Sequence, residues 1–362
     1  MKKIFALTYQ RYLFREVMLG TLLVLVAFLV LFGFFDLIGE LGDIGKGGFQ
    51  FHHALVYVLL SLPGRAYELM PIAVLIGALY ALSTLARHSE ITVLRASGMS
   101  TRDLLGSLFR VAGVFALVTF LIGEFVAPPA EQMAQEVRLK AMGTVVAADF
   151  RTGLWVKDGQ SFINVAQVLP DTRLLGIRIY EFDAQRHLVS VSDAKEGEYV
   201  PPDAWRLNGV VRTFVDNNGG RVQRLPSLTW KSALSPDILS VLLVVPERMS
   251  VINLVTYLKH LSVNHQKTQR YQIALWKKII YPLAGFVMVA LALPFGYTHD
   301  RVGGVSLRIF GGVMLGVFFH MLNGLFANLG VINSWPPFSS AVAPSALFLL
   351  AAGAMIWWVE RR

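Results

Sequence analysis

Long apolar stretches are the feature of this 362-residue chain that most restricts its fold. A helix that crosses a lipid bilayer needs about 20 mostly apolar residues. Six stretches meet this requirement, and we expect a transmembrane helix in each: Val17–Leu37, Ala66–Leu85, Leu104–Val126, Ile279–Tyr297, Leu307–Leu329 and Ser339–Val359. Only 16% of the residues are charged, against about 25% in a typical soluble domain, so the composition also indicates a membrane protein.

Prolines predict irregularities in the second and third spans. The apolar run Ala54–Ala86 is too long for one straight crossing at a rise of about 1.5 Å per residue. We therefore expect a partly interfacial segment followed by a kink near Pro71. The third span is expected to stop at Pro128-Pro129, and a separate helix is expected over Ala130–Val146.

Lysine and arginine are distributed unevenly among the segments that connect the spans. The loops on one side contain only Lys46, whereas the other side and both termini contain Lys2, Lys3, Arg11, Arg15, Arg87, Arg95, Arg102, Arg110, Arg301, Arg308, Arg361 and Arg362. Because basic residues are retained on the cytoplasmic side, we expect both termini in the cytoplasm and the long middle segment outside, in the periplasm if the cell is Gram-negative. Topology thus explains the net charge of +9, and we expect no nucleic-acid partner.

The segment between the third and fourth spans has the pattern of a β-domain. Alternating runs predict short strands at Leu154–Lys157, Gln160–Val165, Leu175–Phe182, His187–Ser192, Trp205–Val215 and Val222–Leu225. The Asp158-Gly159 pair predicts a hairpin turn between the first two. Short strands at this spacing favour a sandwich or jelly roll over βαβ units. A helix is expected to begin after Ser250, a good N-cap residue, and to continue to about Val263.

The expected fold is therefore a mostly α-helical polytopic membrane protein of six transmembrane helices with an all-β, jellyroll-like domain inserted between the third and fourth. Residues 1–129 form the first three spans, with a short cytoplasmic helix near 87–100. Residues 130–270 form the β-domain with flanking helices. Residues 271–362 form the last three spans.

Motifs for nucleotide hydrolysis and for hydrolytic catalysis are absent. The chain has no GxxxxGK[ST] phosphate loop, no HExxH and no GxSxG, which would respectively bind nucleotide phosphates, hold catalytic zinc and present a serine nucleophile. It has no cysteine, and its eight histidines are scattered. We therefore expect no metal site, no cofactor bound by this chain and no enzyme activity. The polar residues His320, Asn323 and Asn328 of the fifth span are expected to form hydrogen bonds between helices.

Several charged residues lie near the outer ends of the second and third spans. Arg65 and Glu68 share one helix face, Glu124 lies close to the end of the third span, and Arg138 and Lys140 follow it. Charge at such depth is costly unless it is paired or faces water. Two interpretations remain open: the residues pair with one another or lie on a solvated face, or they form the rim of a cavity that meets a charged headgroup.

The segment Arg87–Ser100, between the second and third spans, predicts a short amphipathic helix that ends at Gly98. Glu90 and Leu94, four residues apart, share one of its faces. The helix could simply lie on the membrane surface. Alternatively, it could be a coupling helix that docks in a groove of a separate motor subunit.

A set of short motifs is shared, in order and at matching positions, with a known family. They are Ser89-Glu90 with Ala96-Ser97-Gly98, Gly123–Pro128, Glu131–Ala134, Gly153–Gly159, and Arg270-Tyr271-Gln272 with Trp276-Lys277-Lys278. Together they resemble the LptF/LptG family, the permease subunits of the bacterial lipopolysaccharide exporter. The resemblance covers essentially the whole chain and implies six spans with a periplasmic β-jellyroll.

The resemblance implies partners as well. The chain would pair with LptF and form a cavity open to the outer leaflet of the inner membrane, where lipopolysaccharide enters. A dimer of the ATPase LptB, which binds the ATP and Mg²⁺, would dock on the coupling helix. The β-domain, with LptC, would continue a periplasmic bridge.

The resemblance, taken together with the charged and apolar residues of this sequence, gives candidate site residues in three groups. The coupling contacts would be Glu90, Leu94, Arg95, Ser97 and Gly98. The rim that meets the lipid headgroup would be Lys46, Arg65, Arg138 and Lys140. The cavity for the acyl chains would be lined by Phe28, Leu31, Phe32, Phe35, Phe319, Leu322 and Phe326.

One departure from the family pattern affects the rim. The outer end of the family's first span is associated with lysines that meet lipid phosphates, whereas this chain has Asp36, Glu40 and Asp43 there. Either the rim cations take over this role or divalent cations bridge the carboxylates to phosphate.

Two other functions remain as alternatives. One is an ATP-driven permease for lipoprotein or another lipid, and the other is a membrane-anchored scaffold for periplasmic assembly. The placement of the β-domain and the motif set argue against the other permease, and association with an ATPase would distinguish a transporter from a scaffold.

Overall fold

The computed structural model describes residues 2–142, 154–168, 173–201, 203–216, 219–232, 246–263, 266–297 and 305–361. Arg301 and Arg362, which contribute to the predicted orientation, lie outside these residues. So do positions 143–146 of the helix predicted after Pro129 and Gly153 of the shared motifs.

Six helices of the described chain are long and apolar enough to cross a membrane, and they overlap the six predicted spans, which are thereby confirmed. The first two are α1 (Lys2–Leu41) and α2 (Phe51–Arg87). The third is α4 (Thr101–Leu121) with its continuations η1 (Ile122–Val126) and α5 (Ala127–Met142). The others are α8 (Gln269–Ile280) with η4 (Tyr281–Leu283) and α9 (Ala284–Gly296), then α10 (Val305–Ile332) and α11 (Pro337–Glu360).

The expected stop at Pro128-Pro129 is wrong, because the helix continues through both prolines. The preceding turn, η1, is a π-helix in which the Ala127 N–H bonds to the Ile122 carbonyl, five residues back. Prolines cannot donate and normally clash with the carbonyl four residues earlier. The wider π turn changes the hydrogen-bond register just before the prolines. Likewise, α2 is a single helix that contains Pro63 and Pro71.

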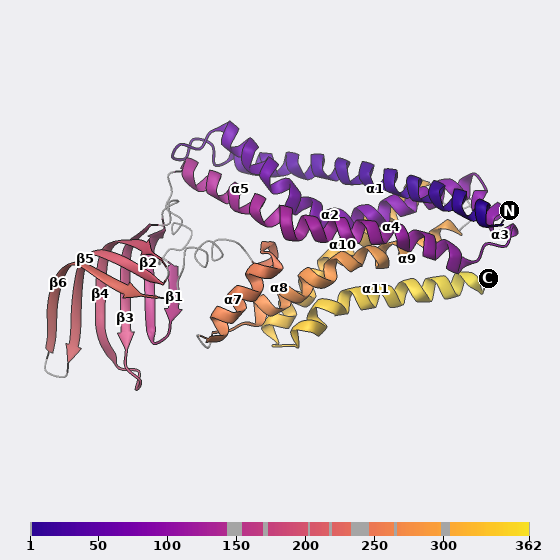
Figure 1. Cartoon of the computed structure of the whole chain (residues 1–362). Helices are drawn as coiled ribbons and strands as arrows, with labels where there is room; N and C mark the ends of the chain where they lie inside the picture. Colours follow the sequence, from indigo (N-terminus) through magenta and orange to yellow (C-terminus); the bar gives the residue numbers. More distant parts are fainter. Residues whose placement is uncertain are drawn as a thin grey trace.

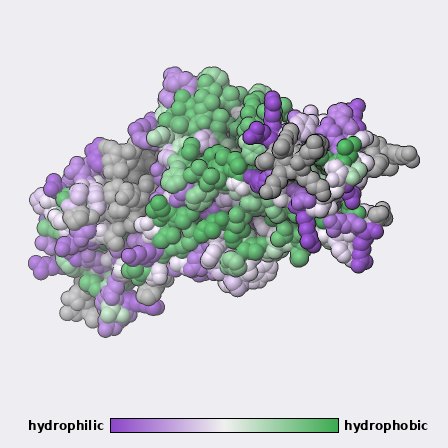
Figure 2. Space-filling view, turned by 45° about the vertical axis from the view of Figure 1, so that its right-hand side comes forward, coloured by the Kyte–Doolittle hydropathy of each residue, from purple (hydrophilic) through white to green (hydrophobic). Residues whose placement is uncertain are grey.

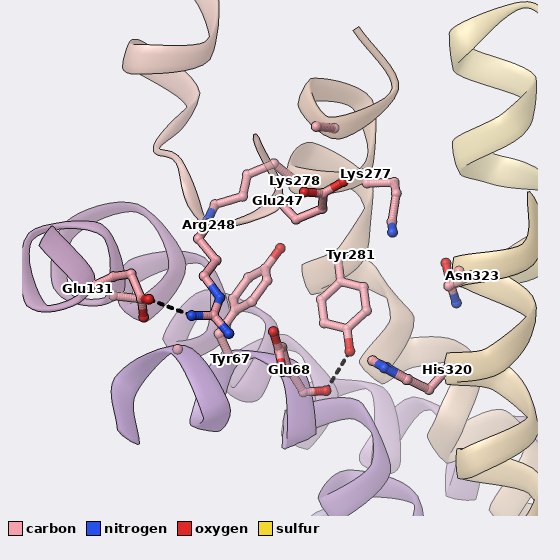
Figure 3. Close-up of a pocket in the computed structure, with 14 residues that line it drawn as sticks. Tyr67, Glu68, Glu131, Glu247, Arg248, Lys277, Lys278, Tyr281, His320 and Asn323 are labelled. Atoms are coloured by element: carbon pink, nitrogen blue, oxygen red, sulfur yellow. Dashed lines mark hydrogen bonds and ion pairs between the residues drawn. The ribbon is translucent and has the colours of Figure 1, made fainter. Parts of the chain in front are cut away.

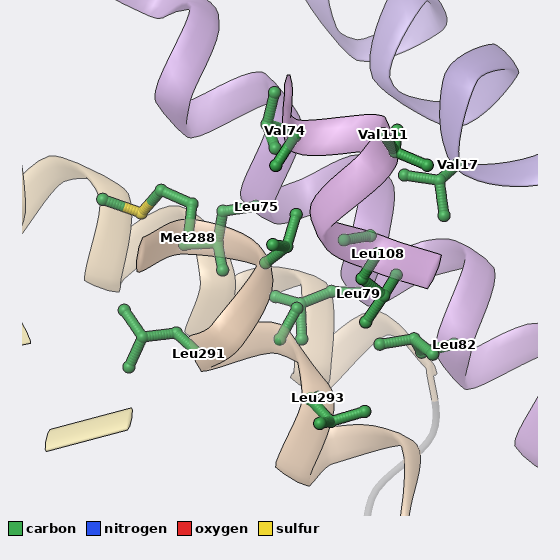
Figure 4. Packing of buried hydrophobic residues seen from close by; sticks show 14 of the residues in the cluster. Val17, Val74, Leu75, Leu79, Leu82, Leu108, Val111, Met288, Leu291 and Leu293 are labelled. Carbon is green, nitrogen blue, oxygen red and sulfur yellow. The ribbon is translucent and has the colours of Figure 1, made fainter. Parts of the chain in front are cut away.

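The core of the membrane region is built around α2 and α9. The buried side of α2 contributes Leu75, Leu79 and Leu82, which pack with Met288 and Leu291 of α9 (Figure 4). Leu108 and Val111 of α4 close the same cluster. By contrast, α1, α10 and α11 expose many large apolar side chains. This combination is expected where lipid or partner helices surround a protein core.

Glycines allow other helices to approach α2 closely. A Cβ placed on Gly77 would lie 2.4 Å from Thr21 Oγ1 and 2.5 Å from the Thr21 nitrogen of α1. On the α10 side, a Cβ on Gly312 would lie 2.2 Å from Leu79 Cδ1. Small residues at such crossings are typical of membrane helices, where close van der Waals packing drives association.

The predicted β-domain is confirmed between the third and fourth spans. Its strands are β1 (Leu154–Asp158), β2 (Ser161–Val168), β3 (Leu174–Phe182), β4 (Leu188–Val200), β5 (Ala204–Asp216) and β6 (Gly219–Lys231). They form one antiparallel sheet in the order β1-β2-β3-β4-β5-β6. One face buries an apolar cluster that includes Ile163, Ile177 and Trp205. The described strands thus form a meander, and the crossover connections of a jelly roll are not among the described elements.

Figure 1 shows the sheet at one end of the molecule and both chain termini at the other. The short helix α3 (Glu90–Ala96) lies at the terminal end. The helix predicted after Ser250 is α7 (Val251–Val263), and the Ser250 hydroxyl accepts the Asn253 N–H at 3.1 Å. Between the two ends, Figure 2 shows a broad apolar surface over the long helices.

Candidate functional site

The short helix α3 has sharply defined ends. Ser89 is the N-cap residue that precedes the helix, and its backbone is in the left-handed region, with φ +59°. Glu90 is the first residue of the helix. At the other end, the Ser97 hydroxyl donates to the Leu94 carbonyl at 2.7 Å. Gly98 follows with φ +92°, a conformation that only glycine adopts without strain. The predicted helix and its Gly98 terminus are therefore confirmed.

The inner face of α3 packs against the membrane helices. Ile91 and Leu94 are buried in the main core cluster, and the Arg95 guanidinium lies over the Tyr297 ring, 4.9 Å from its centroid. Leu94 therefore anchors the helix, although the resemblance had placed it among the docking contacts. The exposed apolar residue is instead Val93, whose surface is 64% exposed. Arg95, Ser97 and Gly98 are exposed, and Glu90 is half-buried.

At the opposite end of α1, the guanidinium of Arg65 is bound by acids of the same chain. Asp36 accepts from Arg65 Nε at 2.9 Å and from Nη2 at 2.8 Å. Glu68 lies 3.4 Å from Arg65 Nη1. Paired arrangements of this kind are the stronger class of hydrogen bond. Arg65 is thus paired within this chain, and it also lines one of the cavities described below.

The other predicted rim cations are paired as well. Arg138 Nη2 lies 2.7 Å from Asp43 Oδ2 and its Nη1 lies 3.4 Å from Glu40 Oε1. Lys46 Nζ donates to Asp43 Oδ1 at 2.6 Å, and hydrogen bonds from Lys46 and Arg138 hold the pKa of Asp43 below its ordinary value. Lys140 pairs with Glu136. The acids that depart from the family pattern are therefore the partners of three of the four rim cations, Lys46, Arg65 and Arg138.

Two adjoining cavities lie beside these pairs. One, of about 220 Å³, is bounded by Phe35, Asp36 and Glu40 of α1 and by Arg65 of α2; we call it the rim cavity. The other, of about 250 Å³, lies among α2, α5, η3 (Pro246–Arg248), α8 and α10; we call it the α8 cavity. Both cavities include Gly64, Glu68, Glu131 and Arg248 in their walls, so they are neighbours.

The α8 cavity has a polar wall built from distant parts of the chain (Figure 3). Glu131 of α5 forms an ion pair with Arg248 of η3. The Tyr281 hydroxyl donates to the Glu68 carbonyl at 2.5 Å. Lys277 and Lys278 of α8 complete this side. Within the described residues, no group of three or more Asp, Glu or His side chains is placed to hold a metal ion.

Glu124, the buried carboxylate of η1, has a clear structural task. Its Oε2 accepts the Val251 N–H at 2.8 Å, and its Oε1 accepts the Ile252 N–H at 3.4 Å. These are the first two amides of α7, which have no partner inside their own helix. Glu124 therefore binds the start of α7 to the third span instead of lining a headgroup rim.

Comparison with known proteins identifies the family to which this chain belongs. The family model described as lipopolysaccharide export system permease LptF/LptG matches residues 11–359. The chain belongs to the LptF/LptG family. The LptG protein of Escherichia coli K12 is 34% identical over 354 residues, covering 97% of this chain and 98% of the relative. The LptG protein of Haemophilus influenzae Rd is 29% identical over 356 residues, covering 98% of each.

In this LptF/LptG family member, the candidate acyl-chain residues do not share one environment. Leu31, Phe32 and Phe35 of α1 are exposed, and Phe28 is half-buried. On α10, Phe319 is only 1% exposed and packs against Phe348 with ring centroids 5.1 Å apart. Phe319 therefore belongs to the protein core and does not face a lipid, whereas Leu322 and Phe326 are half-buried.

The sequence analysis did not assign the residues that line the α8 cavity. Tyr67, Glu131, Arg248, Lys277 and Lys278 come from four separate elements, and no spacing in the sequence brings them together. His320 and Asn323 face the same cavity. The hydrogen bond predicted for Asn323 is made within its own helix, because its amide donates to the Phe319 carbonyl at 3.0 Å. The sequence signal that could have indicated this cavity is the pair of adjacent lysines, Lys277 and Lys278, at the start of an apolar span.

Proposed function

We propose that this chain is the permease subunit of a lipopolysaccharide exporter. It extracts lipopolysaccharide from the outer leaflet of the inner membrane and passes it to a periplasmic bridge. The observation that carries the proposal is the family match over residues 11–359. The layout supports it, with membrane-spanning helices that join a short exposed helix at one end to a β-domain at the other.

A separate motor follows from the energetics of extraction. Removing each CH₂ group from apolar surroundings costs about 0.8 kcal/mol, so a lipid with several acyl chains does not leave the bilayer spontaneously. The chain has no phosphate loop. ATP and Mg²⁺ therefore bind to a partner, the LptB ATPase dimer, and this chain carries no cofactor of its own.

The surface of α3 is the contact for that ATPase. Its inner face is fixed by Ile91, Leu94 and the Arg95–Tyr297 contact, so a push on its outer face is delivered to the membrane helices. Glu90, Arg95, Ser97 and Gly98 are the contacts, and Val93 adds an exposed apolar side chain.

LptF covers exposed apolar surface of the long helices, and the cavity between the two subunits receives the lipid. The β-domain joins those of LptF and LptC in the bridge. Both termini and α3 lie in the cytoplasm and the sheet lies in the periplasm of a Gram-negative cell, which agrees with the Lys and Arg distribution and with their positions at opposite ends of the molecule.

A charge reversal in α3 tests the proposal. We expect Glu90→Lys to abolish co-purification of the ATPase and to stop lipopolysaccharide export, measured as surface lipopolysaccharide in living cells. The matched control is Glu360→Lys, an exposed acid at the same end of the molecule, which should change neither result. A Glu90→Lys chain that still binds the ATPase and exports lipid would refute the coupling role. A wild-type chain that never associates with an ATPase would favour the scaffold.

A further inference from the structure

The carboxylates in the wall of the α8 cavity all have cations that neutralise them. Glu68 lies 3.4 Å from Arg65, and Glu131 pairs with Arg248. Glu247 lies 3.5 Å from Arg270. Two of these cations, Arg65 and Arg270, are outside the cavity wall. The acids of the cavity are therefore satisfied without using its lysines.

Lys277 and Lys278 are the cavity cations that have no carboxylate within ion-pair distance among the described residues. Lys278 is only 7% exposed, and its ammonium lies over the Tyr67 ring, 4.7 Å from the centroid. Lys277 is half-buried, and Figure 3 shows its ammonium directed into the cavity on the side of Tyr281 and Asn323.

This arrangement has a high electrostatic cost in the free protein. A charge that leaves water without a compensating partner is strongly unfavourable. The Tyr67 ring offsets part of the cost for Lys278. An anion bound in the cavity would reduce the rest, because its negative charge would attract the ammonium groups that line the cavity.

The surroundings define what kind of anion fits. The cavity of about 250 Å³ lies between membrane-spanning helices, and it has room for a phosphate group but not for several acyl chains. His320 and Asn323 on the opposite wall supply further polar groups. Lysine binds phosphate well as a point charge. The rim cavity adjoins this one and shares Gly64 and Glu68 in its wall.

We propose that the α8 cavity is a binding site for a lipid-borne phosphate, held by Lys277 and Lys278. This inference deepens the proposed function and rests on it for the identity of the lipid. It differs from the rim assignment, because Arg65, Arg138, Lys46 and Lys140 are already paired with acids of this chain.

The test compares a phosphorylated lipid with its dephosphorylated form. The full chain, with its co-purified partner subunits, is placed in phosphatidylcholine nanodiscs and titrated with lipopolysaccharide, with enzymatically dephosphorylated lipopolysaccharide and with phosphatidylglycerol. We expect the Lys277→Gln/Lys278→Gln double variant to bind phosphorylated lipopolysaccharide at least about tenfold more weakly, since charge-assisted hydrogen bonds are the stronger class. Its affinity for the dephosphorylated lipid should equal that of the wild type.

Further variants exclude a general structural effect. Lys277→Gln alone changes the half-buried lysine and should show part of the loss. Lys278→Arg keeps the charge and should retain phosphate-dependent binding. Lys259→Gln, at an exposed lysine of α7 outside both cavities, should change neither affinity.

The outcomes separate this site from the proposed function. Equal binding by the double variant and the wild type, or equal loss for both forms of the lipid, would overturn the phosphate site while leaving the exporter intact. If the wild type bound no lipopolysaccharide but bound phosphatidylglycerol through the lysines, the site would stand and the proposed function would fall. Binding of neither anionic lipid would overturn both.

Discussion

Asp36, Glu40 and Asp43 lie at or just beyond the C-terminal end of α1, and each forms an ion pair with a cation that the sequence analysis placed at the headgroup rim. A lipid phosphate that approached Arg65 or Arg138 would compete with these carboxylates. No such competitor is paired with Lys277 or Lys278 among the described residues. The two sets of cations therefore differ in the charge that they offer to an incoming headgroup.

Replacing Glu124 tests its role at the start of α7. Glu124→Ala removes the acceptor for the Val251 and Ile252 amides. We expect a loss of about 1–2 kcal/mol in local stability, the usual effect of deleting an N-terminal helix cap. Hydrogen exchange should show faster exchange in the first turn of α7.

Glu136→Ala serves as the control for that measurement. Its carboxylate pairs with Lys140 at an exposed site, where ion pairs contribute little. If Glu124→Ala left α7 exchange unchanged, the contact would not stabilise that helix.

The turn between β3 and β4 gives a pH-dependent prediction. The His187 N–H donates to Asp183 Oδ1 at 2.7 Å, and this bond lowers the pKa of Asp183 below its ordinary value. The bond therefore stabilises the turn fully above the ordinary carboxyl pKa of about 4. This contribution is lost as the pH falls through the lowered pKa of the folded protein.

NMR of the His187 amide should follow this loss. We expect its chemical shift to move below about pH 4, and Asp183→Asn should abolish the transition. Asp193→Asn, in the same sheet, should leave it in place. A His187 shift that titrated identically in Asp183→Asn would contradict the assignment.

The contacts of individual residues are what the sequence predicted least well. The sequence placed charges near the outer ends of the spans correctly, but it could not select partners. Arg65 and Asp36 are 29 residues apart, and Arg138 and Asp43 are 95 apart. Such pairs depend on how α1, α2 and α5 pack. The four-residue spacing put Leu94 on the same face of α3 as Glu90, yet Leu94 is buried in the core beneath the helix.

At the scale of elements, hydrophobic length predicted all six spans, because a bilayer fixes the length of a crossing helix. Helix ends were harder to predict, since Pro63, Pro71 and Pro128 lie inside helices. A π turn directly precedes the helix that contains Pro128. The α8 cavity was not predictable, because it exists only where α2, α5, η3, α8, η4 and α10 meet.

The crossing of α1 and α2 gives a prediction at this scale. Gly77→Ala would place a Cβ within 2.6 Å of the Thr21 backbone, so the helices must move apart. We expect a loss of about 1–3 kcal/mol, the usual cost of overpacking, seen as a lower unfolding midpoint in detergent. Gly106→Ala makes the same change where no atom lies within 4 Å and should not lower the midpoint. Equal midpoints for the two variants would refute the close crossing.

For the whole molecule, the orientation can be tested directly because the chain contains no cysteine. We expect Gln223→Cys in the sheet and Ser334→Cys between α10 and α11 to react with a membrane-impermeant maleimide in cells whose outer membrane has been permeabilised. Glu360→Cys, at the other end, should react only after the inner membrane is opened. All three positions are exposed. Labelling of Glu360→Cys in closed cells would reverse the orientation.

The order of the strands bears on how this part of the chain is made. Each described strand from β2 to β6 pairs with the strand that precedes it in the sequence. A sheet whose contacts are local in sequence closes short loops and folds faster than one with distant pairings. As the segment emerges from the translocation machinery, the strand that precedes each new strand has already crossed the membrane and is available for pairing. The sheet can therefore grow during synthesis, before the last three spans exist.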